Sequence, residues 1–388
     1  MSDLGGERAA SADRRKTDVM IFGLRTVGEG LGGVEAHVDN LAHELDELGL
    51  SVVVAIRSGY ANKGWVRGRA TRFIPFWAPR SQNWEAVVHS LLVTIHAIFH
   101  RPRIVHVHAI GPSLVVPLLR LAGLKVVTTH HGEDYNREKW GVVAAAALRV
   151  GEWCQAMFAN ARICVSPSLS RRLEQRYGRP YIYIPNGVRA VTPVAESNEL
   201  AKYGLVPGKY VLTVSRLVPE KRHLDLIGAF ELLERPDLRL AMVGGGDHAT
   251  PYSAAVAERA RAVPNVVMTG LLTGVSLHQL FSHAGVFALP STHEGLPIAL
   301  LEAMSFGRKV VASDIAPNLD IRLPAENYHM VGDIEDLSRK LGEALVDDAS
   351  ALAGNDWSEL LSAFDWTAIA RRTLEVYSDV SPYIGMAL

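Results

Sequence analysis

Short runs of apolar residues recur along the chain, and the stretches between them keep apolar residues at helical spacing. The runs are rich in Val, Ile and Leu, which is typical of buried strands. They lie at 18–24, 51–56, 104–109, 125–129 and 181–184 in the first half, and at 210–215, 238–243, 265–269, 285–289 and 309–311 in the second. Strands that alternate with helices favour a parallel sheet whose right-handed crossovers place the following loops on one rim. The pattern predicts an α/β protein with two doubly wound, Rossmann-like domains.

The composition describes a soluble globular protein. Of the 388 residues, 48% are hydrophobic and 21% are charged, and the length suffices for two domains. The net charge of −1 gives no general attraction to nucleic acid. Two cysteines are too few for a disulfide framework, no apolar run reaches the ~18 residues of a membrane span, and residues 1–16 lack the apolar core of a secretory signal. We therefore expect a cytoplasmic protein with no nucleic-acid partner.

The stretch 290–311 places two carboxylates around the start of a predicted helix. Glu294 lies in the preceding loop, Pro297 suits the first helical turn, and Glu302 lies inside the helix. The amides of 296–298 are unpaired at a helix N-terminus, the usual place to hold a phosphate, and the helix rise puts Glu302 on the order of 8 Å beyond it. A nucleotide diphosphate-sugar fits this spacing. Taken alone, the same residues also suit a helix cap and a solvated acidic face.

The segment EGLPIALLE resembles the E-x7-E signature of retaining, nucleotide-sugar-dependent glycosyltransferases of family four. Enzymes of that family have the GT-B architecture, in which two Rossmann-like domains face each other across a cleft. The resemblance covers about 18–377 and implies that Glu302 holds the ribose and Glu294 the donor sugar. The donor contacts that it implies in this segment are Glu294, Gly295, Leu296, Pro297, Ile298 and Glu302.

Two cations follow the first strand of the second half. Arg216 and Lys221 lie on a loop that enters a predicted helix. A guanidinium can hold a diphosphate bidentately, and an ammonium adds a compact charge. The pair resembles the Arg-x4-Lys donor motif of the same family. Without that context, the two would be surface cations beside Glu220.

Glycine-rich loops follow two predicted strands. Gly32 and Gly33 open the helix after 18–24, a geometry that brings backbone amides to a phosphate. Gly245 follows a later strand and lets the backbone approach the nucleotide side of the donor. The first loop is no strict Gly-x-Gly-x-x-Gly turn; GLGGVEAHV resembles instead the Gly-Gly-Val-Glu loop that opens the acceptor domain of the family. By itself, such a loop is often only a tight turn.

A polar cluster begins where the predicted strand 125–129 ends, which is where open α/β sheets bind ligands. The segment HGEDYNREKWG resembles the His-Gly-x-Asp segment of bacterial polysaccharide glycosyltransferases in the family. That resemblance implies that His131 lies under the transferred sugar and that Asp134 and Arg137 order a loop over the acceptor. His130 is expected to be a buried histidine that is tied to the backbone.

Two further histidines invite a metal interpretation. His106 and His108 share one face of a predicted strand, and His130 and His131 follow the next strand. No third and fourth ligands stand at a familiar metal spacing, and the segment also resembles an ordinary inner strand of the family. We expect no metal and no cofactor, because Arg216 and Lys221 can balance the diphosphate charge.

The segment 60–84 is basic and aromatic. It contains five Lys or Arg residues and no acid, interleaved with Trp and Phe. One hypothesis is that it meets an anionic membrane surface or a lipid-phosphate acceptor. The alternative is a solvated loop whose aromatic side chains fill local core.

The resemblance also implies a division of the chain, because Pro-Asn-Gly-Val at 185–188 resembles the interdomain exit of the family. The expected parts are a disordered tail at 1–16, an acceptor-binding domain at 17–190, a linker at 191–198, a donor domain at 199–360, and a C-terminal helix at 361–388 that crosses back to the first domain.

We therefore expect a retaining glycosyltransferase whose catalytic residues are His131, Arg216, Lys221 and Glu294. The donor would be a UDP-, GDP- or dTDP-sugar and the acceptor a saccharide or a polyprenyl-linked molecule, in cell-surface polysaccharide synthesis at the inner face of the membrane. A non-catalytic nucleotide-sugar-binding protein is one alternative. A nicotinamide-dependent oxidoreductase is another, although it would need an acid after the second strand, where Arg57 stands.

Overall fold

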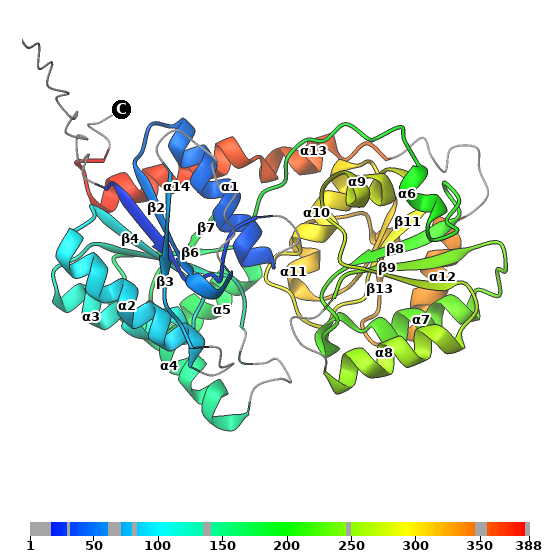
Figure 1. Cartoon of the computed structure of the whole chain (residues 1–388), viewed down its shortest axis with the longest axis horizontal. Helices are drawn as coiled ribbons and strands as arrows, with labels where there is room; N and C mark the ends of the chain where they lie inside the picture. Colours follow the sequence, from blue (N-terminus) through cyan, green and yellow to red (C-terminus); the bar gives the residue numbers. More distant parts are fainter. Residues whose placement is uncertain are drawn as a thin grey trace, which may run out of the picture.

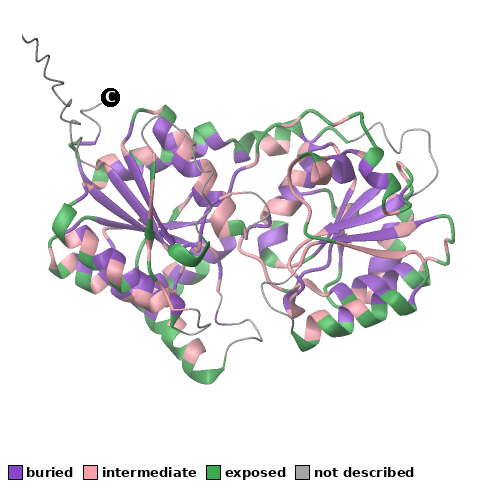
Figure 2. Ribbon diagram, viewed as in Figure 1, coloured by how far each residue is buried: buried purple, intermediate pink, exposed green. Residues whose placement is uncertain are grey.

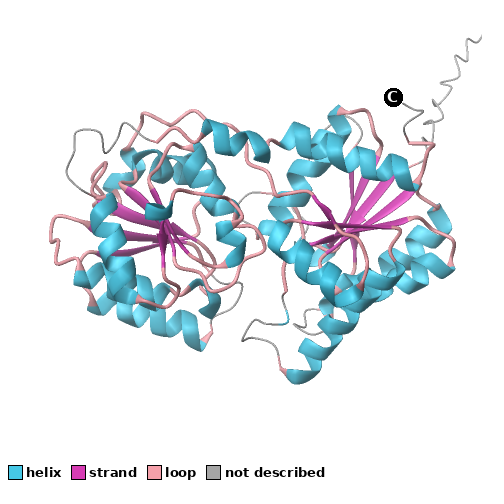
Figure 3. Cartoon of the chain, turned by 180° about the vertical axis from the view of Figure 1, so that it is seen from behind, coloured by secondary structure: helices cyan, strands magenta, loops and turns pink. Residues whose placement is uncertain are grey.

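The computed structural model folds the chain into two α/β domains, each built on one parallel sheet (Figure 1). It describes residues 17–28, 32–60, 71–79, 84–133, 135, 141–245, 250–345 and 355–384. Helices lie on both faces of each sheet (Figure 3), so most strands are buried throughout (Figure 2). Strands covered on both faces must be apolar at nearly every position, which explains the continuous apolar runs of the sequence. The predicted fold class is confirmed.

The first sheet has seven strands among the described residues, in the order β3-β2-β1-β4-β5-β6-β7. The strands are β1 (Val19–Phe22), β2 (Val52–Arg57), β3 (Arg72–Phe76), β4 (Ile104–His108), β5 (Val126–His130), β6 (Ala161–Cys164) and β7 (Ile182–Tyr183). The helices are α1 (Gly33–Glu47), α2 (Glu85–His100), α3 (Val116–Leu121), α4 (Val142–Phe158) and α5 (Pro167–Tyr177). The strand order reverses at β1, and open sheets of this kind bind ligands beyond the strand ends at such a reversal.

The second sheet repeats this design with six described strands, in the order β10-β9-β8-β11-β12-β13. The strands are β8 (Tyr210–Val214), β9 (Arg239–Val243), β10 (Val266–Gly270), β11 (Val286–Leu289), β12 (Val310–Ser313) and β13 (Tyr328–His329). The helices are α6 (Asn198–Ala201), α7 (His223–Leu232), α8 (Pro251–Ala262), α9 (Gly274–His283), α10 (Ile298–Ser305), α11 (Ala316–Leu319), α12 (Ile334–Ala344) and α13 (Ser358–Leu361). The order reverses at β8, so the loops after β8 and β11 are neighbours.

The last helix, α14 (Trp366–Val380), belongs to the core of the first domain. It lies beside α1 (Figure 1), and its residues Trp366 and Tyr377 are buried there. The close fit extends to Gly187, where a Cβ would come within 2.6 Å of the Trp366 ring. A short parallel bridge joins Val188 to Asp365. The chain thus passes between the domains twice, and both passages meet at this point.

The segment 60–84 is only partly a loop, because it contains the strand β3. Of the two alternatives for this segment, the solvated loop does not hold at 72–76, where Arg72 to Phe76 pair with β2. Proline is tolerated there because β3 is the edge strand, so Pro75 needs no N–H for a further neighbour. Residues 61–70 and 80–83 lie outside the described residues.

Candidate active site

The two acids of the signature segment occupy different environments at the start of α10. Glu294 lies in the loop after β11, Pro297 is the extended residue before the helix, and Glu302 lies in the middle of the helix. Pro297 was expected in the first turn, but the helix begins one residue later, at Ile298. The N–H groups of the first turn of α10 have no partner within the helix. The end of β11 thus leads directly to a place that can hold an anion.

Lys221 and Glu294 form an ion pair that joins the two loops. Their Nζ and Oε1 atoms are 2.5 Å apart, and the side chains are 18% and 9% exposed. The backbone N–H of Thr292 also donates to the carbonyl of Glu220 at 2.9 Å. The cation and the acid are therefore placed by each other before any ligand binds, and Glu294 faces a lysine in this structure.

The carboxyl group of Glu302 has no hydrogen bond or ion pair within the described part of the chain. Burial raises the pKa of its carboxyl group to about 7, because the ionised form is poorly solvated there. Glu302 is half-buried, and a carboxylate that lacks a protein partner gains from any ligand hydroxyl that donates to it. Such a group suits the ribose role that the resemblance implies.

Arg216 follows β8 and is half-buried. The structure describes no hydrogen bond or ion pair for its guanidinium among the residues it covers. Beside it, a Cβ at Gly244 would lie 1.9 Å from the Ser215 carbonyl oxygen, so the ends of β8 and β9 can approach only with glycine there. A Cβ at Gly245 would meet nothing within 4 Å. The backbone at Gly245 is therefore open to a ligand.

The glycines of both domains let the donor loop contact the first domain. A Cβ at Gly295 would lie 1.8 Å from the His131 carbonyl oxygen, so this contact requires glycine. A Cβ at Gly132 would lie 3.4 Å from the Cα of Gly295, and one at Gly33 would lie 3.7 Å from Ile298. The structure thereby brings His131 and the start of α1 to the Glu294–Glu302 segment. Near Gly32, only the side chain of Glu35 is close.

His131 belongs to a cluster of neutral histidines. Its Nε2 atom lies 2.9 Å from Nδ1 of His108, and His37 packs edge-on against it. Burial lowers the pKa of His37 to about 4, that of His106 to about 3, and those of His108 and His131 well below the ordinary value of 6.5. The first domain thus presents polar but uncharged imidazoles near the loop of Glu294.

Three of these histidines could hold a metal ion. One nitrogen each of His37, His108 and His131 lies within 4.8 Å of the others, and His37 also bonds to Asn186 at 3.0 Å. Imidazole nitrogens suit Zn²⁺. However, the facing nitrogens of His108 and His131 already form a hydrogen bond with each other, so a metal would have to replace that bond.

The sequence analysis missed several residues that complete the site. His37 comes from α1, and the Asn186 amide bridges it to the Leu296 carbonyl at 2.8 Å. His37 lies in the quoted segment GLGGVEAHV but was not singled out, whereas Asn186 was seen only as part of a turn. Conversely, the predicted acceptor residues Asp134 and Arg137 lie outside the described residues.

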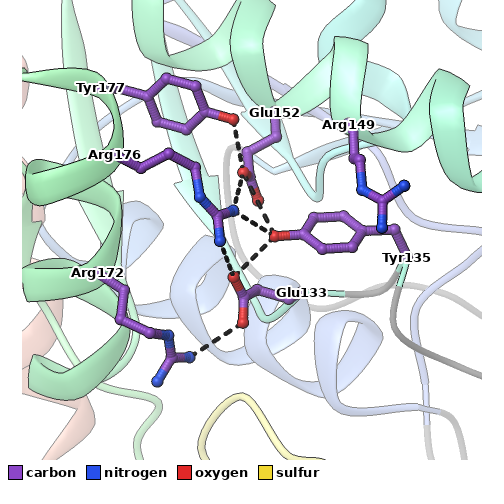
Figure 4. A pocket seen from close by; sticks show the side chains of 7 residues that line it. All are labelled: Glu133, Tyr135, Arg149, Glu152, Arg172, Arg176 and Tyr177. Atoms are coloured by element: carbon purple, nitrogen blue, oxygen red, sulfur yellow. Dashed lines mark hydrogen bonds and ion pairs between the residues drawn. The ribbon is translucent and has the colours of Figure 1, made fainter.

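His130 is tied to the backbone, as predicted. The Gly132 N–H donates to its Nδ1 atom at 3.2 Å, and its Nε2 atom lies 3.0 Å from Glu152. A polar pocket borders Glu152 on its other side (Figure 4). Its lining residues are Glu133, Tyr135, Arg149, Glu152, Arg172, Arg176 and Tyr177.

Known protein families match both domains. The family described as "Glycosyltransferase Family 4" matches residues 31–190, and "Glycosyl transferases group 1" matches 197–355. The chain is 29% identical, over 69% of its length and 73% of the relative, to the GDP-mannose-dependent alpha-(1-6)-phosphatidylinositol monomannoside mannosyltransferase of Mycolicibacterium smegmatis. It is 27% identical, over 90% of its length and 94% of the relative, to the phosphatidyl-myo-inositol mannosyltransferase of Mycobacterium leprae.

Solved structures share the whole fold. The sucrose-phosphate synthase of Thermosynechococcus elongatus superposes with a TM-score of 0.78 at 21% identity, covering 94% of this chain and 99% of that one. Anabaena HepE, solved with UDP and glucose, gives a TM-score of 0.76 at 19% identity, covering 93% and 99%. Because one glycosyltransferase model matches each of its two Rossmann-like domains, the chain belongs to the glycosyltransferases of the GT-B fold and is an enzyme of that class.

Proposed function

We propose that the protein is a retaining enzyme that moves a sugar from a nucleotide diphosphate-sugar to a saccharide or lipid-linked acceptor in cell-surface polysaccharide synthesis. The observation that carries the proposal is the arrangement of the loops at the carboxyl ends of the strands of the second sheet, the second rim. There, Arg216 and Lys221 follow β8, Lys221 pairs with Glu294 in the loop before α10, and Glu302 lies within α10 with a carboxylate that has no partner among the described residues. This arrangement offers cations and backbone N–H groups to a diphosphate and an acceptor carboxylate to a ribose.

The proposed reaction needs charge stabilisation more than a protein nucleophile. The bond between the anomeric carbon and the phosphate oxygen breaks, and the acceptor oxygen bonds to that carbon. On the front face, the leaving phosphate oxygen takes the proton of the acceptor hydroxyl, so the configuration is retained. Arg216, Lys221 and the first-turn amides of α10 hold the developing diphosphate charge, while His131 supports the sugar as a neutral group.

The donor base is proposed to be uracil, guanine or thymine. One relative is named for GDP-mannose, and one structural neighbour was solved with UDP. Thermal unfolding with a panel of UDP, GDP, dTDP and ADP tests this. We expect one of the first three to raise the melting temperature, because a ligand that binds only the native state stabilises it. No shift with any of them, together with no calorimetric binding of their sugars, would refute the donor proposal.

We further propose that the enzyme sits on the inner face of the membrane, through the first domain. No helix in the described part of the chain has the length and apolarity needed to span a bilayer. Residues 48–132 contain ten Lys and Arg residues but a single acid, Glu85, although the whole chain carries −1. Glu85 is buried and 2.9 Å from Arg57. Among the described residues of this stretch, Arg72, Arg101 and Lys125 are exposed, and such positive surface charge favours anionic lipids.

Apolar side chains accompany this charge on the outer helices. Leu91, Ile95 and Phe99 recur at every fourth residue of α2 and are exposed, so they form one stripe. The neighbouring α3 adds exposed Leu118 and Leu121. Trp77, inside the segment 60–84, and Trp84, at its end, are also exposed. Apolar groups beside cations are the composition of surfaces that lie in a lipid interface.

Vesicle sedimentation tests the membrane proposal. An Ile95→Ser/Phe99→Ser double variant should lose binding to vesicles with anionic phosphatidylglycerol, and wild type should bind poorly to neutral phosphatidylcholine. Val275→Ser on α9, which removes an equally exposed apolar residue of the second domain, is the matched control. Equal sedimentation of all three proteins would contradict the proposal.

A further inference from the structure

A fully buried pair stands behind the loop that carries His131. His130 and Glu152 have side chains that are 0% exposed, and they lie 3.0 Å apart. His130 ends β5, and Glu152 comes from the middle of α4. The proposed reaction uses neither of them. Burying a carboxylate and an imidazole is costly unless both are fully hydrogen-bonded, so the contacts of this pair need an explanation.

The backbone fixes the proton position on His130. The Gly132 N–H can only donate, so the Nδ1 atom of His130 accepts and must carry a lone pair. The ring proton then lies on Nε2, from which it is donated to Oε2 of Glu152. Neither ring nitrogen is left over, and His130 is locked as one neutral tautomer in one orientation.

Glu152 is held ionised from its other side. The Tyr177 hydroxyl donates to its Oε1 atom at 2.7 Å, and Arg176 donates at 2.9 Å (Figure 4). Burial alone would raise the pKa of Glu152, but the bonds from His130, Tyr177 and Arg176 outweigh it and lower the pKa to about 2. The carboxylate is therefore a constant acceptor, and it fixes where the Nε2–H group of His130 points.

The bond from Gly132 transmits this order to the site. Gly132 has φ +133°, a conformation that other residues rarely adopt. Its peptide carries the His131 carbonyl, against which Gly295 lies so closely that no Cβ would fit. The position of the 131–132 peptide thus determines where His131 stands and how the loop of Glu294 meets the first domain.

We propose that His130 and Glu152 are positioning residues for the transfer step. Through the Gly132 N–H, they hold the His131–Gly132 peptide in place beneath the transferred sugar and against the donor loop. The inference rests on the proposed role of His131, but the two can fail separately. Donor binding and wild-type turnover test the function, whereas the variants below test the positioning.

Two substitutions of His130 separate its two hydrogen bonds. In His130→Asn, the amide oxygen takes the place of Nδ1 and can still accept from Gly132. In His130→Gln, the amide nitrogen takes the place of Nε2 and still reaches Glu152, but the Gly132 acceptor is lost. We expect the Gln variant to lose on the order of 10²-fold in kcat, since a displacement of about 1 Å can have that effect. The Asn variant should keep at least ten times more activity than the Gln variant.

The KM for the nucleotide sugar should stay the same in both variants, because the donor cations are untouched. Glu152→Gln should lower kcat in the same way. His329→Asn, which removes another buried imidazole on β13, controls for the general cost of such a change and should keep the wild-type kcat. Melting temperatures are measured for all four variants. Equal kcat in His130→Asn and His130→Gln, or kcat losses that simply follow the melting temperature, would overturn the proposal.

A measurement on the wild type keeps the test open if the variants fail to fold. With ¹⁵N-labelled histidine, the NMR signal of His130 should show a protonated Nε2 and an unprotonated Nδ1 at pH 7.5. A proton on Nδ1 would contradict the Gly132 bond, and with it the positioning role.

Discussion

The loops at the carboxyl ends of the two sheets, the first and the second rim, meet between the domains. They differ in whether their polar side chains have partners within the protein. On the first rim, His108 bonds to His131 and His37 bonds to Asn186, and burial keeps these imidazoles neutral. On the second rim, Arg216 and Glu302 have no protein partner within the described residues. The imidazoles of the first rim bond to neutral groups of the same domain, although the buried Nε2 atom of His108 has no partner among the described residues, whereas the second rim has charges that gain from a ligand. The comparison indicates that ligand charge falls on the second domain and that the first supplies shape and polarity.

The removal of a cation of the second rim is expected to have the largest effect, and it tests whether this rim carries the charge of the ligand. Arg216→Ala should lower kcat/KM by about 10²–10³-fold, and Lys221→Ala should lower it similarly, because each group stabilises charge that develops on the leaving diphosphate. Arg216→Lys keeps the charge but loses the planar fork, so it should fall between Ala and wild type. Steady-state kinetics with the identified donor measure the effect. Turnover close to wild type in either Ala variant would show that the charge is balanced elsewhere.

A second test uses the acidity of Glu302. Because its pKa is raised to about 7, lowering the pH from 8 to 6 protonates the carboxyl group in the free enzyme. It then loses part of its capacity to accept ribose hydroxyls, so kcat/KM for the donor should fall as the pH drops through 7 and level off at the value of the protonated form. This acidic limb should be missing in Glu302→Gln. A limb of the same position in that variant would assign it to another group.

The same raised pKa makes a prediction for stability with the opposite sign. The native state holds the Glu302 proton more tightly than the unfolded chain, so ionisation at pH 8 opposes folding. Glu302→Gln should therefore raise the free energy of unfolding at pH 8 but change it little at pH 4. Urea denaturation at both pH values measures this. A variant that is less stable at pH 8 would show that the carboxylate has a partner in the native enzyme.

The histidine rim can be tested by acid. The pKa values of His37 and His106 lie near 4 and 3, so the unfolded chain takes up protons below pH 6.5 that the native protein does not. Stability is full above pH 6.5 and is lost as the pH falls toward 4, by about 3 kcal/mol for each such histidine. His106→Gln should reduce the slope of urea stability against pH. An unchanged slope would mean that His106 is charged in the native state.

The smallest expected effect is that of metal removal. If the cations of the second rim balance the diphosphate, turnover should be unchanged after dialysis against excess chelator. Loss of activity that Zn²⁺ restores would instead make His37, His108 and His131 a metal site, and the contrast between the rims would disappear.

The sequence predicted most of the fold because strands buried between helices need long apolar runs. Among the strands of the first sheet, β3 and β6 were missed. The edge strand β3 mixes exposed and half-buried residues and tolerates Pro75, so it lacks such a run, and β6 has only four residues, one of which is Arg162. The motif segments around Arg216, Lys221 and Glu302 were found because each follows a strand directly. Their placement on one rim follows from the parallel topology.

The first rim was harder to predict because its members come from distant segments. His37 lies on the inner side of α1, and Asn186 bonds to it from a turn 149 residues later in the chain. Glu152 is the single acid of α4, and the sequence alone suggests that such an acid lies on the surface. Only the tertiary fold shows that it is fully buried beside His130.

The double passage of the chain between the domains has a mechanical consequence. The segment 185–198 leaves the first domain, and the segment before α14 returns to it. Because Val188 and Asp365 are bridged, the two domains are connected by two chain segments that lie side by side. Such a double connection favours a hinge rotation of one domain relative to the other over a twist or a sliding motion. Substrates would then enter and leave on the side opposite the two connecting segments. A protein truncated before Trp366 would lose the second connection and the helix α14 that packs in the core of the first domain.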